Sequence, residues 1–180
     1  MARNDIRCTM QVPGGLGAGQ ISTALFGAST FEEGEPVVYD TVGSTGYLME
    51  AGDDNATITG ISAASSLGMT ANGELGILAG DPQPRPDGTW IQFYKPVDGQ
   101  IFVCSNFATD GAGTAVVPTI ADCVGETAGF TFAGGNYIVD TGCANHHVEI
   151  VAVIDANAIP LGDRLRTPGA GVTVVFGFLT

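Results

Sequence analysis

The last apolar stretch of the chain, residues 170–179, constrains the fold more than any other segment. Valine and phenylalanine alternate there, so an extended strand would carry one apolar face made of Val172, Val174, Phe176 and Phe178. Such β-branched and aromatic residues favour a strand over a helix. Burying that face contributes roughly 6–12 kcal/mol, which is comparable to the net stability of an ordinary domain. We therefore expect this strand to lie inside a sheet, and a chain without residues 171–180 not to fold.

Short extended segments separated by turns precede this strand. Residues 130–132 and 137–139 flank Ala133-Gly134-Gly135-Asn136, which is typical of a hairpin turn. The segment from Thr89 to Cys104 predicts a second hairpin, with its turn at residues 96–99. His147 to Asp155 has apolar residues on both faces, which indicates a central strand covered on both sides.

Weaker patterns occur between these segments. Val116-Val117 predicts another strand, and Thr119 to Gly125 predicts a short helix or turn. Ile58 and Ile61 would point to opposite faces of a regular strand, so we expect a bulge at Gly60 that returns them to one face. Residues 81–88 include prolines at alternate positions, and we expect an exposed loop that joins neither a helix nor a sheet ladder.

These patterns predict an all-β fold, either an antiparallel β-sandwich or a small, tulip-like β-barrel, with only short helical turns. We expect residues 31–180 to form a single β domain. Residues 1–30 differ, because they contain Pro13-Gly14-Gly15-Leu16-Gly17 and show little apolar periodicity. They predict an extended N-terminal arm, either a frayed terminus or a segment that becomes ordered against a partner.

The chain is strongly acidic, with 19 acidic and 6 basic residues and a formal net charge of −13. Such a charge repels nucleic acid and anionic lipid, so we expect neither nucleic acid nor a membrane as a partner. No apolar run approaches the roughly 20 residues of a membrane helix, and we expect synthesis in the cytosol. The cysteines are therefore predicted to be free thiols rather than a disulfide framework: Cys8, Cys104, Cys123 and Cys143.

Residues suited to catalysis or metal binding occur without a recognisable motif. Cys143 and His146 have a metal-like spacing, but a zinc site needs two more ligands and the sequence has no second close pair. The carboxylates that a glycosidase or a calcium site would need fall in loops, where they are typical of a solvated surface: Glu32, Glu33, Glu35, Asp53 and Asp54. We expect no enzymatic activity, no metal and no cofactor.

Aromatic residues gather in the predicted 89–104 hairpin, namely Trp90, Phe93, Tyr94 and Phe102. Aromatic side chains of this kind stack on sugars or bases in some binding proteins. At hairpin spacing they are more typical of a core, and the net charge argues against nucleic acid. We therefore predict that they are core residues.

Several segments from residue 31 onward follow one another in a characteristic order. Phe31-Glu32-Glu33-Gly34-Glu35-Pro36-Val37 precedes Asp53 to Ala63, which contains Ile58-Thr59-Gly60-Ile61. Tyr94 to Phe102, Asn136 to Asp140 and Glu149 to Val153 come before the apolar C-terminal strand. In this order the segments resemble the head-decoration, or cement, proteins of tailed bacteriophages. The resemblance covers roughly residues 31–179 and leaves the 1–30 arm unaligned.

This resemblance implies a β-rich viral structural protein on the exterior of the phage capsid. There it would tie neighbouring major capsid protein subunits together as a homo-oligomer, a trimer being favoured over a dimer. The family has no catalytic residues to transfer. For contact with the shell we name four arginines, two in the arm and two in the loop over residues 156–170: Arg3, Arg7, Arg164 and Arg166.

Two other function classes stay open. One is a different phage structural part, a tail or fibre-base protein with a carbohydrate-binding β-sandwich. The other is a small cupin-like or hydrolytic β enzyme, although a cupin needs several histidines and this chain has 2. Co-sedimentation with capsids, retardation on a glycan column and metal content distinguish the three classes.

Overall fold

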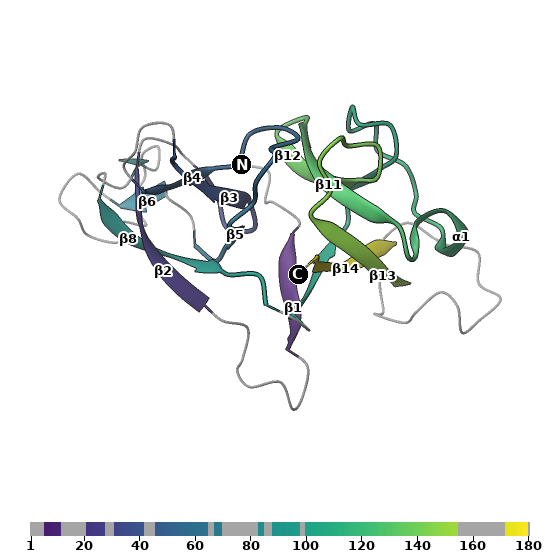
Figure 1. Cartoon of the computed structure of the whole chain (residues 1–180), viewed down its shortest axis with the longest axis horizontal. Helices are drawn as coiled ribbons and strands as arrows, with labels where there is room; N and C mark the ends of the chain where they lie inside the picture. The colour runs from purple at the N-terminus through teal and green to yellow at the C-terminus, as the bar shows by residue number, and fades with distance from the viewer. Residues whose placement is uncertain are drawn as a thin grey trace.

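The computed structural model describes residues 6–11, 21–27, 31–41, 46–64, 67–69, 83–84, 88–97, 100–154 and 172–179. Nearly every element within these residues is a β-strand, which confirms the predicted all-β class. The strands form a small closed barrel, a seven-stranded sheet, and a two-stranded ribbon of β6 (Leu67–Met69) and β7 (Gln83–Pro84). Figure 1 shows the barrel at one end of the molecule and the short helix α1 at the other.

Five strands close the barrel in the order β2-β4-β3-β5-β8. They are β2 (Ile21–Phe26), β3 (Pro36–Tyr39), β4 (Leu48–Glu50), β5 (Gly60–Ser62) and β8 (Thr89–Tyr94). The pairs are antiparallel except for β2 and β4, which run parallel. Because alternate strand residues point inward, one apolar cluster fills the barrel: Ala24, Phe26, Phe31, Val37, Leu48, Ile91 and Phe93.

The seven-stranded sheet has the order β1-β9-β14-β13-β11-β12-β10. Its strands are β1 (Arg7–Gln11), β9 (Gln100–Cys104), β10 (Phe107–Ala108), β11 (Thr127–Ala133), β12 (Asn136–Asp140), β13 (Val148–Ile154) and β14 (Thr173–Phe178). A second apolar cluster packs against it and includes five buried aromatic rings: Phe102, Phe107, Phe130, Tyr137 and Phe176.

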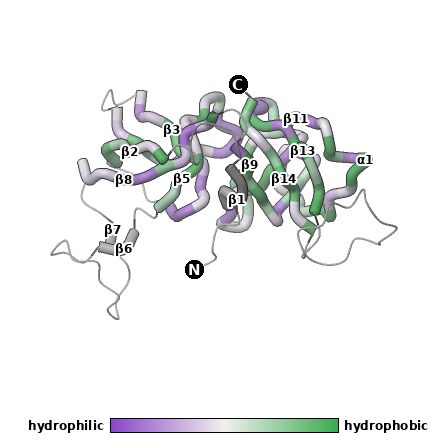
Figure 2. Tube along the Cα trace, turned by 90° about the horizontal axis from the view of Figure 1, so that it is seen from below, coloured by the Kyte–Doolittle hydropathy of each residue, from purple (hydrophilic) through white to green (hydrophobic). Residues whose placement is uncertain are grey.

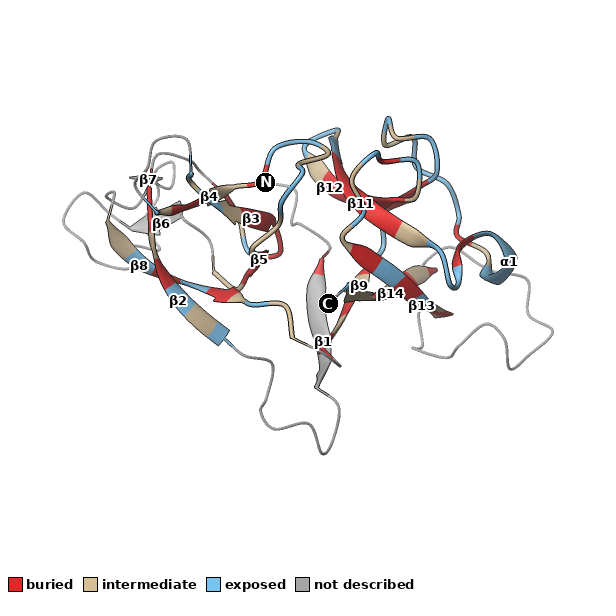
Figure 3. Ribbon diagram, in the orientation of Figure 1, coloured by how far each residue is buried: buried red, intermediate tan, exposed pale blue. Residues whose placement is uncertain are grey.

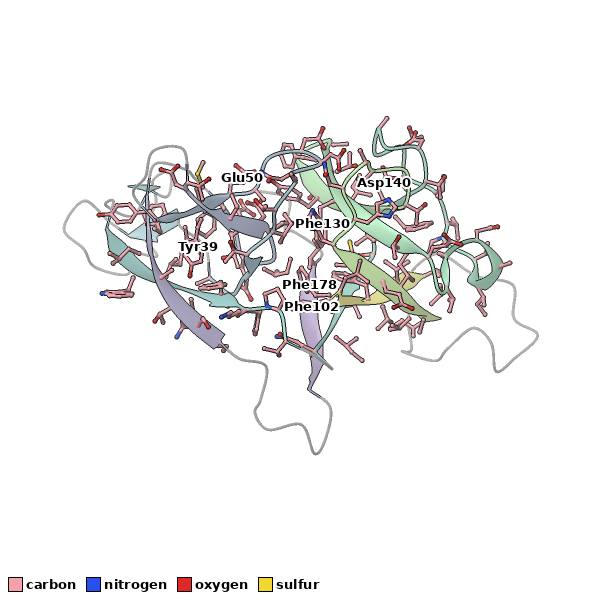
Figure 4. The ribbon with its side chains drawn as sticks, in the orientation of Figure 1. Tyr39, Glu50, Phe102, Phe130, Asp140 and Phe178 are labelled. Atoms are coloured by element: carbon pink, nitrogen blue, oxygen red, sulfur yellow. The ribbon has the colours of Figure 1, made fainter. Side chains whose placement is uncertain are left out.

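β14 confirms the strand predicted near the C-terminal end. It lies between β9 and β13 and pairs antiparallel with both. Phe176 is fully buried, and its ring stacks on Phe102 with the ring centroids 5.7 Å apart. Figure 4 shows Phe102, Phe130 and Phe178 close together where β9, β11 and β14 converge. The apolar face predicted from the sequence is therefore the centre of the larger core.

β11 and β12 form the hairpin predicted around Gly134 and Gly135. Ala133 pairs with Asn136, which leaves these two glycines alone in the turn, with φ values of 62° and 83°. A two-residue turn of this kind needs positive φ at both central positions, which glycine adopts without steric cost. β13 confirms the strand predicted over residues 147–155, and it pairs with both β11 and β14. The prediction that both its faces are covered is wrong, because Val151 on its outer face is 46% exposed.

The segment from Thr89 to Cys104 is not a hairpin, contrary to the prediction. β8 pairs with β2 and β5 in the barrel, whereas β9 pairs with β1 and β14 in the sheet. The connection through Pro96 thus passes from one body to the other. Turn-forming residues predict a change of direction, but they carry no information about which strands pair afterwards.

Three weaker predictions have mixed outcomes. Val116 and Val117 lie outside any strand and are both exposed, so the strand predicted there is wrong. The prediction that residues 81–88 join no sheet ladder is wrong at Gln83–Pro84, because Pro84 pairs with Leu67 in the small ribbon, where a two-residue ladder tolerates the missing N–H of proline. Ile58 and Ile61 both contact the larger core, in agreement with the shared face that was predicted. The bulge predicted at Gly60 is wrong, because β5 pairs with β3 in a regular register through Gly60 and Ile58 lies before the strand.

The segment predicted as an N-terminal arm, residues 1–30, contains two strands. β1 pairs antiparallel with β9 at one edge of the sheet, and β2 pairs along its whole length with β8 in the barrel. Ile6 and Phe26 are buried in the two bodies. The described parts of this segment therefore belong to the sheet and the barrel, and the rest of the predicted arm lies outside the described residues.

The helix α1 (Ile120–Cys123) confirms the short helix predicted over residues 119–125. Thr119 caps it, because its hydroxyl accepts a hydrogen bond from the Asp122 N–H at 3.3 Å. The helix lies beside β13 at the end of the molecule away from the barrel (Figure 1).

Candidate interaction surface

A tight loop between β4 and β5 fastens the barrel to the seven-stranded sheet. Asp54 lies at its centre with φ of 43°, a left-handed conformation that aspartate tolerates better than most residues. Its carboxylate accepts hydrogen bonds from the N–H groups of Ala144 (3.0 Å) and Asn145 (2.9 Å). The Asn145 N–H is the main cause that holds the pKa of Asp54 below its ordinary value, although desolvation acts in the opposite direction. Asp54 is thus an ionised acceptor for the backbone of a distant turn.

The neighbours of Asp54 extend this connection. Asp53 Oδ1 accepts a hydrogen bond from the Phe132 N–H at 2.9 Å, which ties the loop to β11. The Asn55 carbonyl accepts one from His147 Nε2 at 2.7 Å. The carboxylates of Asp53 and Asp54 that the sequence placed on a solvated surface therefore serve as acceptors between the two bodies.

Tyr137 on β12 makes a second connection to the barrel. Its hydroxyl donates a hydrogen bond to the Ala51 carbonyl and lies 3.1 Å from Glu50 Oε1. Burial of the ring, followed by the nearby charge of Glu50, raises the pKa of the Tyr137 hydroxyl. The hydroxyl therefore stays protonated and acts as a donor from the sheet to the strand-end of β4.

Asp140, at the end of β12, is a fully buried carboxylate. It accepts hydrogen bonds from the N–H groups of Gly111 (3.1 Å), Gly113 (3.2 Å) and Gly142 (2.8 Å), and from the Thr131 hydroxyl (3.2 Å). Four donors compensate for a burial that would otherwise be strongly unfavourable. The carboxylate thereby holds the loop over residues 109–114 against the β11–β12 hairpin.

Cys143 and His146, whose spacing resembles that of metal ligands, make hydrogen bonds within the protein. His146 Nε2 donates to the Cys143 carbonyl (2.8 Å), so Nδ1 accepts from the Thr127 hydroxyl (2.6 Å). Burial raises the pKa of the Cys143 thiol to about 11, so the thiol stays protonated at neutral pH. Within the part of the chain that the structure describes, no cluster of three or more His, Cys, Asp or Glu residues is arranged to hold a metal.

The cysteines were predicted to be free thiols. Cys104, Cys123 and Cys143 are buried thiols that form no disulfide, which agrees with that prediction. The side chain of Cys8 lies outside the described residues.

Exposed apolar side chains concentrate at the α1 end of the molecule. Ten large hydrophobic residues are exposed among the described positions, and half of them lie on α1, just before or after it, or on the adjacent β13. These five are Val116, Val117, Ile120, Val124 and Val151. Figure 3 shows most of α1 as exposed. This concentration distinguishes the α1 end from a surface on which single apolar residues are scattered.

Carboxylates lie among these aliphatic side chains. Asp122, Glu126 and Glu149 are exposed, and residues 114–127 and 148–154 contain no lysine or arginine. Figure 2 shows hydrophobic and hydrophilic residues side by side along this end of the chain. We call the following set the α1 patch: Val117, Ile120, Val124 and Val151, with Asp122, Glu126 and Glu149.

A smaller apolar surface lies on the outside of the barrel. Trp90 on β8 is 64% exposed and pairs across the strands with Leu25 of β2. The predicted core role is confirmed for Phe93 and Phe102, which are buried, and is wrong for Trp90. Alternate residues of β8 point away from a closed barrel, so a strand this aromatic places one large ring in solvent.

The four arginines predicted to contact a partner are not placed by the structure. Arg3, Arg164 and Arg166 lie outside the described residues, and Arg7 lies in β1 with its side chain outside the description. Among the side chains that are described, Lys95 is the single lysine or arginine, and it is exposed just after β8. The described surface is therefore mainly acidic.

The sequence does not predict the α1 patch as a surface. Val116-Val117 instead indicates a strand, because two adjacent β-branched residues have that preference. The available signal was Pro118 followed by the Thr119 cap, which starts a helix too short to bury its own apolar residues.

Comparisons of the chain with protein-family models, with curated proteins and with solved structures found no match. Among the described residues, no helix has the length and apolar character needed to cross a lipid bilayer.

Proposed function

We propose that this chain is a capsid decoration protein, a viral structural protein on the exterior of a bacteriophage head that stabilises contacts between major capsid protein subunits. The observation that supports the proposal most strongly is the α1 patch, an exposed apolar surface on a small β protein. Apolar clusters of this kind mark sites of protein–protein contact. The resemblance of residues 31–179 to cement proteins supports the same class of function.

In this proposal the protein acts by adhesion and not by chemistry. The loop at Asp54 and the Tyr137 hydroxyl join the barrel to the sheet, so the contact surface lies on a body whose two parts are fastened together by hydrogen bonds. A rigid body loses little conformational entropy when it binds. A homo-oligomer, a trimer in preference to a dimer, would present one such surface per protomer and would bridge several shell subunits at once.

The proposal is tested on phage heads assembled without this chain. Purified chain is mixed with such heads, and the heads are sedimented and analysed by mass spectrometry. We expect the chain to sediment with the heads at a copy number that scales with the major capsid protein, and decorated heads to rupture at a higher temperature. Absence of the chain from gradient-purified virions, or a copy number matching the tail, contradicts the proposal.

A second candidate is a tail or fibre-base protein that binds carbohydrate, and the exposure of Trp90 favours it. An exposed indole presents a flat apolar face with a polar N–H at its edge, which suits stacking against a sugar ring. This function predicts retardation on a column of immobilised cell-surface glycan that Trp90→Ala abolishes. If the unmodified chain elutes at the same volume as a protein that does not bind glycans, the carbohydrate-binding function is contradicted.

A further inference from the structure

We propose that the α1 patch is the face that contacts the shell, and that it docks onto a surface with an apolar centre and a rim of lysine or arginine side chains. The inference rests on the proposed function for the identity of the partner. It adds which face of this chain makes the contact and which residue types form the surface of the partner.

Contacts on the inner side of α1 fix the position of the apolar residues at the centre of the patch. The Cys123 thiol is fully buried and donates a hydrogen bond to the Thr119 carbonyl, which fixes the inner side of α1. Ile120 and Val124 lie one helical turn apart and are joined by a backbone hydrogen bond of 3.1 Å. Both are 39% exposed, so the outer side of the helix presents two aliphatic side chains to solvent.

β13 carries a further exposed aliphatic side chain of the patch, Val151. Its register with β14 shifts between Ile150 and Ala152, and such a bulge re-aims the side chain between them. Ile150 is fully buried, whereas Val151 is 46% exposed. The Gly125 N–H donates to the Ile150 carbonyl at 2.8 Å, so the chain that leaves α1 runs directly beside Val151.

The charges around this centre select the partner. Glu126 accepts at its carbonyl from the Ile150 N–H, and Glu149 pairs with Thr127 on the neighbouring strand. These two exposed carboxylates and Asp122 therefore lie on the segments that carry the apolar residues. A second copy docked patch to patch would bring the same carboxylates close together, and like charges across an interface are unfavourable. A basic rim gives the complementary arrangement.

The apolar centre is tested by measuring the binding of single variants to undecorated heads. Val117→Ser and Val151→Ser each remove an exposed aliphatic side chain from a different segment, so a folding defect in one leaves the other informative. We expect each to weaken binding about tenfold, the effect of losing a central contact residue. Ile21→Ser is the matched control, because Ile21 is a 50% exposed aliphatic residue on the barrel. It should bind as the unmodified chain does.

The acidic rim is tested with the double variant Glu126→Gln and Glu149→Gln. We expect binding about threefold weaker at low salt and a smaller difference at high salt, because screening removes the attraction that the variant has lost. Glu33→Gln, an exposed carboxylate in the barrel, is the control and should change neither value.

The outcomes separate the two proposals. If the unmodified chain binds to heads and both Val117→Ser and Val151→Ser weaken that binding, the decoration function and the α1 patch are both supported. If neither these variants nor the rim variant changes the binding, the α1 patch is overturned as the contact face, and the decoration function stands. No binding of the unmodified chain to heads overturns both. If sedimentation velocity shows self-association and Val117→Ser abolishes it, the patch binds a second copy of the chain, and the proposal of a basic partner surface is overturned.

Discussion

The barrel and the seven-stranded sheet differ in how their aromatic residues pack. In the barrel, Phe26 and Phe31 meet edge to face with their centroids 5.9 Å apart, and the two residues are close in sequence. In the sheet, Phe176 contacts both Phe102 and Phe130, at 5.7 Å and 5.9 Å. These three rings come from strands spread over the second half of the chain. The core of the sheet therefore depends on contacts between distant segments, whereas part of the barrel core is local.

The buried carboxylates show the same contrast. Glu35 in the barrel accepts from the Glu32 N–H at 2.9 Å, three residues away in one turn. Asp140 in the sheet accepts from Gly111, which lies 29 residues earlier, as well as from Gly142. The Glu32–Glu35 hydrogen bond orders one turn, whereas the hydrogen bonds of Asp140 join separate loops. We therefore expect substitutions in the sheet to be more destabilising than matched substitutions in the barrel.

The largest difference is expected between Phe176→Ala and Phe31→Ala. Both side chains are almost fully buried, and Phe→Ala substitutions in cores destabilise by about 3–5 kcal/mol. We expect Phe176→Ala at the upper end of this range, because it removes a ring that two others contact, and Phe31→Ala at the lower end. Urea unfolding followed by circular dichroism measures both. Equal losses in the two variants would remove the distinction between the two cores.

A smaller loss is expected for Asp140→Ala. Removal of the buried carboxylate leaves the N–H groups of three glycines without their acceptor, and the expected destabilisation is about 3 kcal/mol. Asp110→Ala is the control in the same region, because Asp110 is exposed and accepts from residues of its own loop. A thermal melt should show a large shift for Asp140→Ala and a slight one for Asp110→Ala. The reverse order contradicts the assigned role.

Tyr137→Phe tests the connection between the two regions. The variant keeps the ring but loses the donor to the Ala51 carbonyl, so we expect a loss of about 1–2 kcal/mol. Calorimetry distinguishes how the loss is distributed. If the barrel and the sheet unfold together, a single transition moves to lower temperature. If the hydroxyl is what couples them, the transition splits in two, and an unchanged melt argues against any coupling through Tyr137.

What could be predicted from the sequence were the elements whose signals are local. Gly134-Gly135 identified the β11–β12 turn, because few residues other than glycine adopt positive φ at two consecutive positions. The alternation around Phe176 identified β14 as a buried strand. The pairing of β8 with β2 was not predictable in this way, since the turn at Pro96 looks the same whether the next strand pairs back or enters another sheet.

The residues that join the two regions gave no local signal at all. Asp54 and Ala144 are 90 residues apart, and an aspartate in a loop is usually a solvated side chain. The α1 patch was missed for a related reason. Whether Val117 is exposed depends on which elements cover it, and this is decided by the whole fold and not by its neighbours in sequence.

The smallest expected effect, and the one that separates the two regions by pH, concerns Asp54. Its pKa is lowered in the folded protein from an ordinary value of 3.8. The stabilisation is therefore fully present above that ordinary pKa and is lost as the pH falls through the lower, folded-state pKa. Acid should release the Ala144 and Asn145 N–H groups, and hydrogen exchange there should accelerate relative to Ala24 and Ile91 in the barrel.

Asp54→Asn keeps a residue that tolerates positive φ but removes the charge, so we expect a loss of about 1 kcal/mol at neutral pH and no acid-dependent change at this loop. If acid accelerates hydrogen exchange equally at the barrel and loop amides, or still accelerates it at the loop in Asp54→Asn, another carboxylate controls the connection between the barrel and the sheet.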